Sequence, residues 1–277
     1  MPIRLIAVDL DGTLLNAQTG ISTRNREAIQ SALSLGITVV VVTGRRFHSA
    51  RPFVEQVAGD ITIISSNGAR IGSISGEVYT HNFLPSAVAR QVIETAREYL
   101  EYAVAIFDVP GPGQIVMHHD AAPEGPAGWY MRNSRRYLVQ TSDLSAAITT
   151  DPVQMMFGGP PDRIAPVEDV LRASPVSSSC HLTWTKYLAR DLSLLDVMNR
   201  GCTKGSALAN WARHCGIRPE EVMAIGDNLN DAEMLQFAGC AVLMANHNYD
   251  TIPSEWTLTL SNDEDGVAAA IERYALS

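Results

Sequence analysis

The first residues that could carry out chemistry are two aspartates near the start of the chain. Asp9 and Asp11 follow an almost unbroken apolar run over residues 3–8, and Gly12 comes directly after them. The run is typical of a strand buried on both faces, and strand alternation would direct both carboxylates to the same side. Like charges beside a dry strand repel each other and lose solvation. A divalent cation would remove this conflict, because hard oxygen ligands bind Mg²⁺; a turn of acidic residues that face water is the alternative.

More acidic and amide residues follow a second apolar run late in the chain. Residues 222–226 lead into Asp227, and Asn228, Asn230 and Asp231 come next. If this run is a strand of the same sheet, its aspartate lies where the first two carboxylates lie. A third carboxylate in that space requires a cation or a proton. Asp231 is also suited to cap the helix that we expect to follow it.

One lysine and one threonine at element boundaries could bind an anion such as phosphate. Lys204 lies in the first turn of a helix expected over residues 203–215, where a cation is unfavourable against the helix dipole. An anion would reverse this, because the lysine and the free N–H groups would both bind it. Thr43 and Gly44 end a β-branched run over residues 37–42, so their O–H and N–H groups can donate to a phosphate oxygen. The alternatives are an exposed lysine and an ordinary strand-ending turn.

Alternating strands and helices must bring these residues together. We expect strands at residues 3–8, 37–42 and 61–65, with a helix at 25–35 between the first two. Strand–helix–strand order predicts parallel strands, and ligands of such sheets bind at the carboxyl ends of the strands. Asn67, just after the third strand, is interpreted either as a turn residue or as a group that faces the ligand.

The alternation of strands and helices breaks in the middle of the chain. Residues 84–194 predict helices on one antiparallel sheet, ending in a strand pair at 178–186 and 189–195. We therefore expect a catalytic core of residues 1–83 and 195–277, with an α+β domain of residues 84–194 inserted into it.

Composition limits the class of protein. The 277 residues are 46% hydrophobic and 18% charged, which is typical of a globular chain. The formal net charge of −9 argues against non-specific binding of nucleic acid. No apolar run reaches the roughly 20 residues of a membrane helix, and no signal-peptide region is recognised at the start. The four cysteines lack metal-type spacing, so we expect reduced thiols in a cytoplasmic protein without a membrane partner. The sequence does not indicate an oligomeric state.

Taken together, the motifs resemble those of the haloacid dehalogenase (HAD) superfamily of phosphatases. Four motifs match in order: Asp-x-Asp-Gly-Thr at 9–13, Thr-Gly at 43–44, Gly-x-x-Lys-Gly at 201–205 and Gly-Asp-x-x-Asn-Asp at 226–231. The segment at residues 261–268 is similar to the end of the sequences of the Cof-type group. The inserted segment resembles, in position and size, a C2-type cap of subclass IIB. The resemblance implies an α/β fold, namely a Rossmann-like core with a parallel sheet plus an inserted α+β cap that selects the substrate.

The resemblance also implies a role for each aspartate in a Mg²⁺-dependent reaction. Asp9 would attack phosphorus and form an aspartyl-phosphate. Asp11 would protonate the leaving oxygen and then activate the water that hydrolyses this intermediate. The Asp9 carboxylate, the Asp11 main-chain carbonyl and Asp227 would hold Mg²⁺.

The remaining motif residues are expected to bind phosphate or to orient the groups that do. Phosphate ligands are expected at Leu10, Thr43, Gly44, Lys204 and Asn230, of which Thr43 and Lys204 also take part in catalysis. Asp231 and Asn228 are expected just outside these ligands, where Asp231 would orient Lys204 or the metal-bound waters.

The expected activity is hydrolysis of a small phosphomonoester, such as a sugar phosphate or a related phosphorylated metabolite. Two alternatives stay open. A phosphotransferase or phosphomutase acting on sugar phosphates would use the same residues, with a sugar hydroxyl in place of water. A non-enzymatic, phospho-accepting receiver-like module also combines Asp, Thr, Lys and Mg²⁺ on a parallel sheet. Asp11 argues against the receiver, since a long-lived phosphoryl-aspartate should lack a positioned base.

Overall fold

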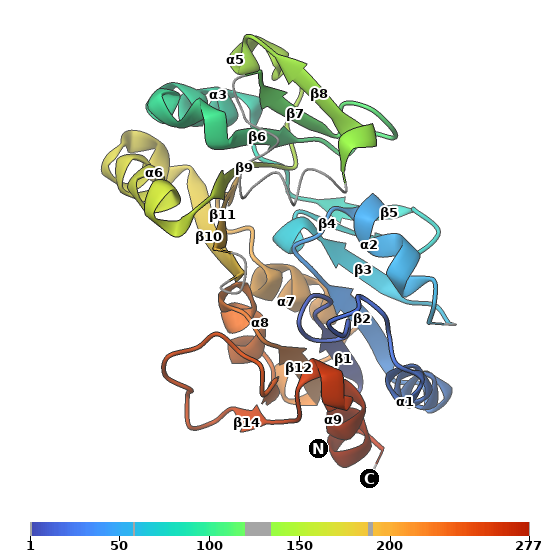
Figure 1. Cartoon of the computed structure of the whole chain (residues 1–277). Coiled ribbons are helices and arrows are strands. Elements are labelled where there is room, and N and C mark those ends of the chain that lie inside the picture. The colour runs from blue at the N-terminus through green and yellow to red at the C-terminus, as the bar shows by residue number, and fades with distance from the viewer. Residues whose placement is uncertain (1, 58, 120–133, 188–190, 277) are drawn as a thin grey trace. The chain divides into compact units, whose positions relative to one another are not determined.

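The computed structural model describes residues 2–57, 59–119, 134–187 and 191–276 of the chain (Figure 1). It divides into two compact units. The first unit joins Met1–His81 to Thr203–Ser277, and the second unit is Asn82–Cys202. No helix in the described part of the chain is both long and apolar enough to cross a membrane.

An eight-stranded sheet forms the centre of the first unit, in the order β14-β13-β12-β1-β2-β3-β4-β5. The strands from β14 to β3 are parallel, whereas β4 and β5 form an antiparallel hairpin at one edge. The strands are β1 (Leu5–Val8), β2 (Thr38–Val42), β3 (Thr62–Ser65), β4 (Arg70–Ser73), β5 (Val78–His81), β12 (Val222–Gly226), β13 (Cys240–Leu243) and β14 (Thr257–Leu258).

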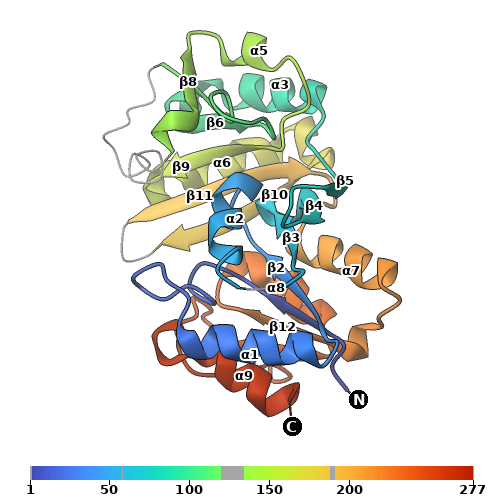
Figure 2. The ribbon, with the colours of Figure 1, turned by 90° about the vertical axis from the view of Figure 1, so that its right-hand side faces the viewer.

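Helices cover both faces of this sheet. They are α1 (Thr23–Ser34), α2 (Phe47–Val54), α7 (Lys204–His214), α8 (Ala232–Phe237) and α9 (Gly266–Tyr274), with 3-10 turns η1 (Ser66–Gly68), η6 (Pro219–Glu221), η7 (Leu229–Asp231) and η8 (Asn262–Glu264). Ile6 and Val8 of β1 belong to the same apolar cluster as residues of α1, α2 and α9. Leu5 and Ala7 belong to a second cluster with residues of α7 and α8. Figure 2 shows α1 and α9 side by side, as their contacts require. The predicted strand at the start of the chain is thus buried on both faces.

The register of the parallel strands brings distant segments to one edge. Val8, the last residue of β1, pairs with Val41 of β2 and with Ile225 of β12. The Asp9 N–H continues the ladder and donates to the Ile225 carbonyl at 3.0 Å. The residues that follow these three strands are therefore neighbours, as the strand–helix–strand pattern predicts.

The second unit has a six-stranded sheet in the order β10-β11-β9-β6-β7-β8. Among its described strand pairs, β7–β8 is parallel and the others are antiparallel. The strands are β6 (Ala103–Ile106), β7 (Ile115–His118), β8 (Leu138–Thr141), β9 (Gln154–Gly159), β10 (Cys180–Tyr187) and β11 (Leu192–Asn199). The helices are α3 (Ser86–Thr95), α5 (Leu144–Ala147) and α6 (Pro161–Ala173), with 3-10 turns η2 (Arg97–Tyr102), η3 (Arg135–Tyr137) and η4 (Pro175–Ser178). One apolar cluster joins residues of α3, α5 and α6 to alternate residues of β6, β9 and β11, so the helices pack on the same face of the sheet.

Candidate active site

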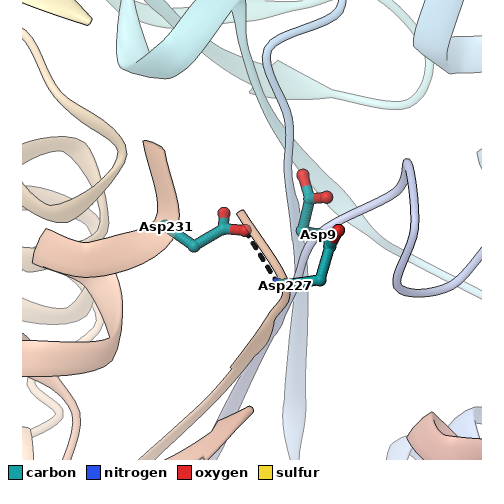
Figure 3. Close-up of side chains that lie close together, drawn as sticks. All are labelled: Asp9, Asp227 and Asp231. Carbon is teal, nitrogen blue, oxygen red and sulfur yellow. Dashed lines mark hydrogen bonds between the residues drawn. The ribbon is translucent and has the colours of Figure 1, made fainter. Parts of the chain in front are cut away.

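Three carboxylates lie together at the carboxyl edge of the parallel sheet (Figure 3). The ammonium group of one lysine, Lys204, contacts two of them. Asp9 directly follows β1, Asp227 directly follows β12, and Asp231 ends η7. One oxygen from each of the three carboxylates lies within 4.8 Å of the others. The four residues are at most 4% exposed. Their charges therefore interact with one another far more strongly than with water.

Lys204 connects two of these carboxylates. Its Nζ donates to Oδ1 of Asp9 and to Oδ1 of Asp231, both at 2.7 Å. The lysine is the first residue of α7, and the Thr203 side chain caps that helix by accepting the Ser206 N–H at 3.0 Å. The predicted position at a helix start is thus confirmed. The unfavourable placement against the helix dipole is offset by two buried negative charges.

Asp231 uses both of its carboxylate oxygens within the protein. Oδ1 binds Lys204, and Oδ2 accepts the N–H groups of Asp227 and Asn228, each at 3.0 Å. Asp231 occupies the N-cap position of α8, as expected, but the expected capping by its side chain is wrong, because that side chain makes no hydrogen bond to the helix. The carboxylate faces back toward the lysine and the loop after β12 instead, and it fixes both.

The turn after β1 shapes the surroundings of Asp227. The Thr13 hydroxyl donates to Oδ1 of Asp227 at 2.9 Å. Gly12 has a φ of +79°, and a Cβ at this position would lie 2.8 Å from Cγ of Asp227. The Gly12 carbonyl accepts a bond from Nδ2 of Asn246 at 2.8 Å. Glycine is thus required both by the left-handed backbone and by the close approach of the carboxylate.

The buried charges shift one another's proton affinity. Burial raises the pKa of Asp9 from 3.8 to about 7; the Lys204 charge opposes this shift, and the Asp231 and Asp11 charges add to it. Burial and the charges of Asp9 and Asp231 raise the pKa of Asp227 well above 3.8. Burial alone would lower the pKa of Lys204, but the charges of Asp231 and Asp9 outweigh it and raise that pKa. The lysine is therefore firmly charged, while the carboxylates exceed the positive charge available to them.

The donor set fits a hard divalent cation. Oδ2 of Asp9 and Oδ2 of Asp227 accept no hydrogen bond from the described residues, whereas both oxygens of Asp231 are taken. Asp9 and Asp227 therefore each have an oxygen that the described residues leave unengaged and that can bind a metal, whereas both oxygens of Asp231 already accept hydrogen bonds. Carboxylate oxygens are the ligands that Mg²⁺ prefers, and a cation would relieve the raised pKa values of both residues.

A second group of polar residues lies at the end of β2. Thr43 is fully buried, and its Oγ1 accepts the Arg45 N–H at 3.1 Å, which leaves the hydroxyl proton to be donated. A Cβ on Gly44 would lie 3.1 Å from Oδ1 of Asn67 and 3.5 Å from Nδ2 of Asn230. The Asn230 amide in turn donates to Oδ1 of Asn67 at 3.0 Å. The expected phosphate ligands Thr43, Gly44 and Asn230 are thus brought together around Asn67.

Asn67 serves the turn and also contacts this group. Its φ of 51° is left-handed, a conformation that Asn tolerates better than most residues. Its N–H donates to the Thr43 carbonyl at 3.0 Å, and its side chain binds Asn230. The two interpretations of Asn67 from the sequence are therefore compatible: the turn is what presents its amide to the group at the end of β2.

Leu10 and Asn228 contribute through the backbone and the loop. The Leu10 side chain is completely buried in the apolar core, so only its main chain is available to a ligand. Asn228 caps η7 by accepting the Leu229 N–H at 2.9 Å, and its carbonyl accepts the Tyr249 hydroxyl at 2.7 Å. Asn228 thus stabilises the loop that carries Asp227 and Asp231.

Asp11 points to a residue that the sequence analysis did not identify as part of the site. β1 ends at Val8, so strand alternation does not determine the direction of Asp11. Its Oδ2 accepts from Nε of Arg45 at 2.7 Å, and its Oδ1 accepts from Nη2 of the same residue at 2.5 Å. Arg45 directly follows the Thr-Gly motif at 43–44, and Thr13 is the last residue of the motif at 9–13. This proximity to a motif was the sequence signal that could have identified both residues.

Known proteins resemble the chain along its whole length. A family model described as haloacid dehalogenase-like hydrolase matches residues 6–271. Phosphatase YwpJ of Bacillus subtilis (strain 168) is 31% identical over 284 residues, which cover 96% of this chain and 98% of the relative. The 5-amino-6-(5-phospho-D-ribitylamino)uracil phosphatase YwtE of the same organism is 28% identical over 289 residues, with 98% of each covered. The crystal structure of a haloacid dehalogenase-like hydrolase from Bacteroides thetaiotaomicron has a TM-score of 0.77 and 29% identity, covering 98% of this chain and 99% of that one.

Proposed function

This chain belongs to the haloacid dehalogenase-like hydrolases, and we propose on that basis that it is a Mg²⁺-dependent phosphatase of small phosphomonoesters. Sugar phosphates or related phosphorylated metabolites are the proposed substrates. The two relatives named above are phosphatases, and the name of YwtE specifies a small phosphorylated metabolite. The observation that carries the proposal is the buried Lys204–Asp9 pair beside Asp227. The buried carboxyl edge of the parallel sheet thus offers three groups. They are a carboxylate nucleophile, an ammonium group that can bind an anion, and a second carboxylate that can bind a metal.

Asp9 is the proposed nucleophile. Lys204 holds its Oδ1, while its Oδ2 accepts no bond within the described residues. A carboxylate oxygen attacks phosphorus in line, and the bond from phosphorus to the leaving oxygen breaks. The product of this step is an aspartyl-phosphate on Asp9.

The proposed Mg²⁺ ligands are the carboxylates of Asp9 and Asp227 and the main-chain carbonyl of Asp11. When bound, the ion supplies positive charge that screens the nucleophile from the phosphate dianion. The protein's own cation, Lys204, acts in the same direction and is held in place by Asp231.

The phosphoryl oxygens are bound by neutral donors as well as by charge. We assign this role to the Thr43 hydroxyl, the main-chain N–H groups of Leu10 and Gly44, and the Asn230 amide. The contact of Asn230 with Asn67 orients that amide. These donors do not distinguish one phosphate ester from another, so substrate choice requires other residues.

Asp11 is the proposed acid and base. It gives a proton to the leaving oxygen in the first step and takes one from the attacking water in the second. The second unit, Asn82–Cys202, is proposed as the cap that selects the substrate and excludes water from the site. Its own six-stranded sheet and its own apolar cluster support this role, because they make it a domain distinct from the core.

The proposed setting is the cytoplasm. All four cysteines lie in the described part of the chain and none of them forms a disulfide, which supports a reducing compartment. The net charge of −9 supports a small metabolite, and not a nucleic acid, as the partner.

The test is release of phosphate by the purified protein. p-Nitrophenyl phosphate and a panel of sugar phosphates are supplied with Mg²⁺ or with a chelator. The wild type is compared with Asp9→Asn and with Asp60→Asn, a matched change at an exposed aspartate of the same unit. We expect Mg²⁺-dependent release that is lost in Asp9→Asn and kept in Asp60→Asn. Equal release by Asp9→Asn would overturn the proposal, and transfer of the phosphoryl group to a second sugar would identify a phosphotransferase.

A further inference from the structure

Arg45 holds the carboxylate of Asp11 with two parallel hydrogen bonds. Nε lies 2.7 Å from Oδ2, and Nη2 lies 2.5 Å from Oδ1. Both side chains are partly shielded from solvent, with 23% exposure for Arg45 and 34% for Asp11. A fork-to-fork pair of this kind fixes orientation as well as distance, which a lysine in the same place would not do.

Arg45 is itself held from the other side. Its guanidinium lies 4.5 Å from the centre of the Phe53 ring on α2, and its N–H donates to Oγ1 of Thr43. The arginine is therefore tied both to a helix of the core and to the end of β2. It is a fixed support for whatever its guanidinium binds.

Asp11 has no comparable support elsewhere in the described part of the chain. Among the described residues, Arg45 is the only partner of its side chain in a hydrogen bond or an ion pair. The strand that precedes it has already ended at Val8. The direction of the Asp11 carboxylate is thus determined by Arg45.

We propose that Arg45 is a positioning residue for Asp11 in the second half of the reaction, an inference that rests on the proposed function. In that half, a water oxygen forms a bond to phosphorus while the bond from phosphorus to Asp9 breaks and its electron pair returns to the Asp9 carboxylate. The water proton passes to Asp11. Each Asp11 oxygen accepts one hydrogen bond from Arg45 and keeps a second lone pair that can accept this proton.

The test separates the two halves of the reaction with p-nitrophenyl phosphate, whose leaving group departs without a proton. The variants are Arg45→Met and Arg45→Lys, with Arg51→Met as control. Arg51 lies on α2, the helix that also carries Phe53, and pairs with Glu55 at 2.7 Å on the exposed surface. We expect kcat to fall about tenfold or more in both Arg45 variants. The ratio kcat/KM should stay within about twofold, because it reports only the steps up to loss of p-nitrophenol.

Three further readouts distinguish positioning from a structural role. Rapid mixing of the Arg45 variants should show a burst of p-nitrophenol, because the aspartyl-phosphate accumulates. In an Asp11→Asn background, Arg45→Met should have no additional effect on kcat. The Mg²⁺ affinity and the circular dichroism spectrum should match those of the wild type.

Several results would overturn the inference. An increase in KM with unchanged kcat would mean that Arg45 binds the substrate. Additive effects of the Arg45 and Asp11 changes, or an equal loss in Arg51→Met, would also contradict it. If the wild type is active and the Arg45 variants have the same kinetics as the wild type, this inference is overturned and the proposed function is not. A wild type that releases no phosphate with Mg²⁺ from any substrate removes the proposed function as well.

Discussion

The Nζ atom of Lys204 lies 2.7 Å from Oδ1 of Asp9, although 195 positions separate the two residues in the sequence. The side chains are 1% and 5% exposed, so the pair is formed in a dry environment. It connects the start of α7 to the end of β1, and Asp231 holds the lysine from the other side. The same contact therefore matters for stability and for the proposed chemistry, and the two roles can be tested separately.

Removal of the lysine charge should destabilise the protein. Lys204→Met leaves the carboxylates of Asp9 and Asp231 buried without their cation. Breaking a buried ion pair in this way costs about 3–5 kcal/mol. Urea unfolding at pH 8 without Mg²⁺ should show a decrease of that size in the free energy of unfolding. The exposed Arg51→Met should change it by less than about 1 kcal/mol. A similarly small change in Lys204→Met would mean that the pair does not stabilise the fold.

Asp227 and Asp231 should differ in their effect on metal binding. Asp227 has a carboxylate oxygen to offer, whereas both oxygens of Asp231 are bound within the protein. Mg²⁺ titration by calorimetry should show a loss of affinity of more than about 100-fold in Asp227→Asn, and a smaller loss of about 10- to 100-fold in Asp231→Asn. Asp231→Asn should instead lower kcat, because the orientation of Lys204 is disturbed. The reverse order of affinities would assign the metal to Asp231.

Gly12 and Gly36 offer a matched pair of backbone positions. Both have a φ of +79°, but a Cβ on Gly12 would meet the Asp227 carboxylate, whereas a Cβ on Gly36 meets nothing within 4 Å. Each change to Ala should cost about 1 kcal/mol or somewhat more through the left-handed backbone. Only Gly12→Ala should also lose Mg²⁺ binding, because the added methyl group displaces Asp227. Equal Mg²⁺ affinity in the two variants would show that the turn after β1 does not set the metal site.

The raised pKa of Asp9 predicts how stability and Mg²⁺ depend on pH. Burial raises this pKa from 3.8 to about 7, so the folded, metal-free protein holds a proton that the unfolded chain releases. The resulting stability is fully present below pH 3.8 and is lost as the pH rises to about 7. Asp227 contributes in the same direction. Mg²⁺ must displace these protons, so it should raise the melting temperature more at pH 8 than at pH 5.

Thermal unfolding of the wild type and Asp9→Asn, with and without Mg²⁺, measures this linkage. The asparagine carries no charge at either pH. The stability of the metal-free wild type relative to Asp9→Asn should therefore fall between pH 4 and pH 7. A relative stability that rises over this range would contradict the assigned direction of the pKa shift.

Most of the core could be predicted from the sequence, because its signals are local. The apolar runs that end at Val8, Val42 and Gly226 identify buried parallel strands, and parallel strands have their carboxyl ends at one edge. That rule is sufficient to bring Asp9, Thr43 and Asp227 together. Lys204 joins them because its helix starts at the same edge.

Side-chain directions beyond the strand ends could not be predicted. Strand alternation predicted that Asp9 and Asp11 point to the same side, but β1 ends at Val8, and the sequence did not indicate that Arg45 binds the Asp11 carboxylate. Asp231 looked like a helix cap, yet two N–H groups and a lysine from a distant helix are its partners. In both cases a charged partner remote in the sequence outweighs the local preference.

Two elements gave weak sequence signals. α2 contains Pro52, a residue that disfavours a helix interior, but the proline lies near the C-terminal end of the helix, which runs from Phe47 to Val54. β8 has no fully buried residue, so its alternation of apolar and polar side chains is faint. Its parallel pairing with β7 also depends on a long connection, which local patterns do not report.

The most direct test of the central claim is to find the phosphoryl group on Asp9 during turnover. The protein is quenched while it acts on p-nitrophenyl phosphate with Mg²⁺, and borohydride then reduces any phosphorylated aspartate to homoserine. Peptide mass mapping locates that residue. We predict homoserine at position 9 in the wild type, in larger amount in Arg45→Met, and none in Asp9→Asn. Phosphate release without a modified Asp9, or with the modification at Asp11, would contradict the assignment of Asp9 as nucleophile.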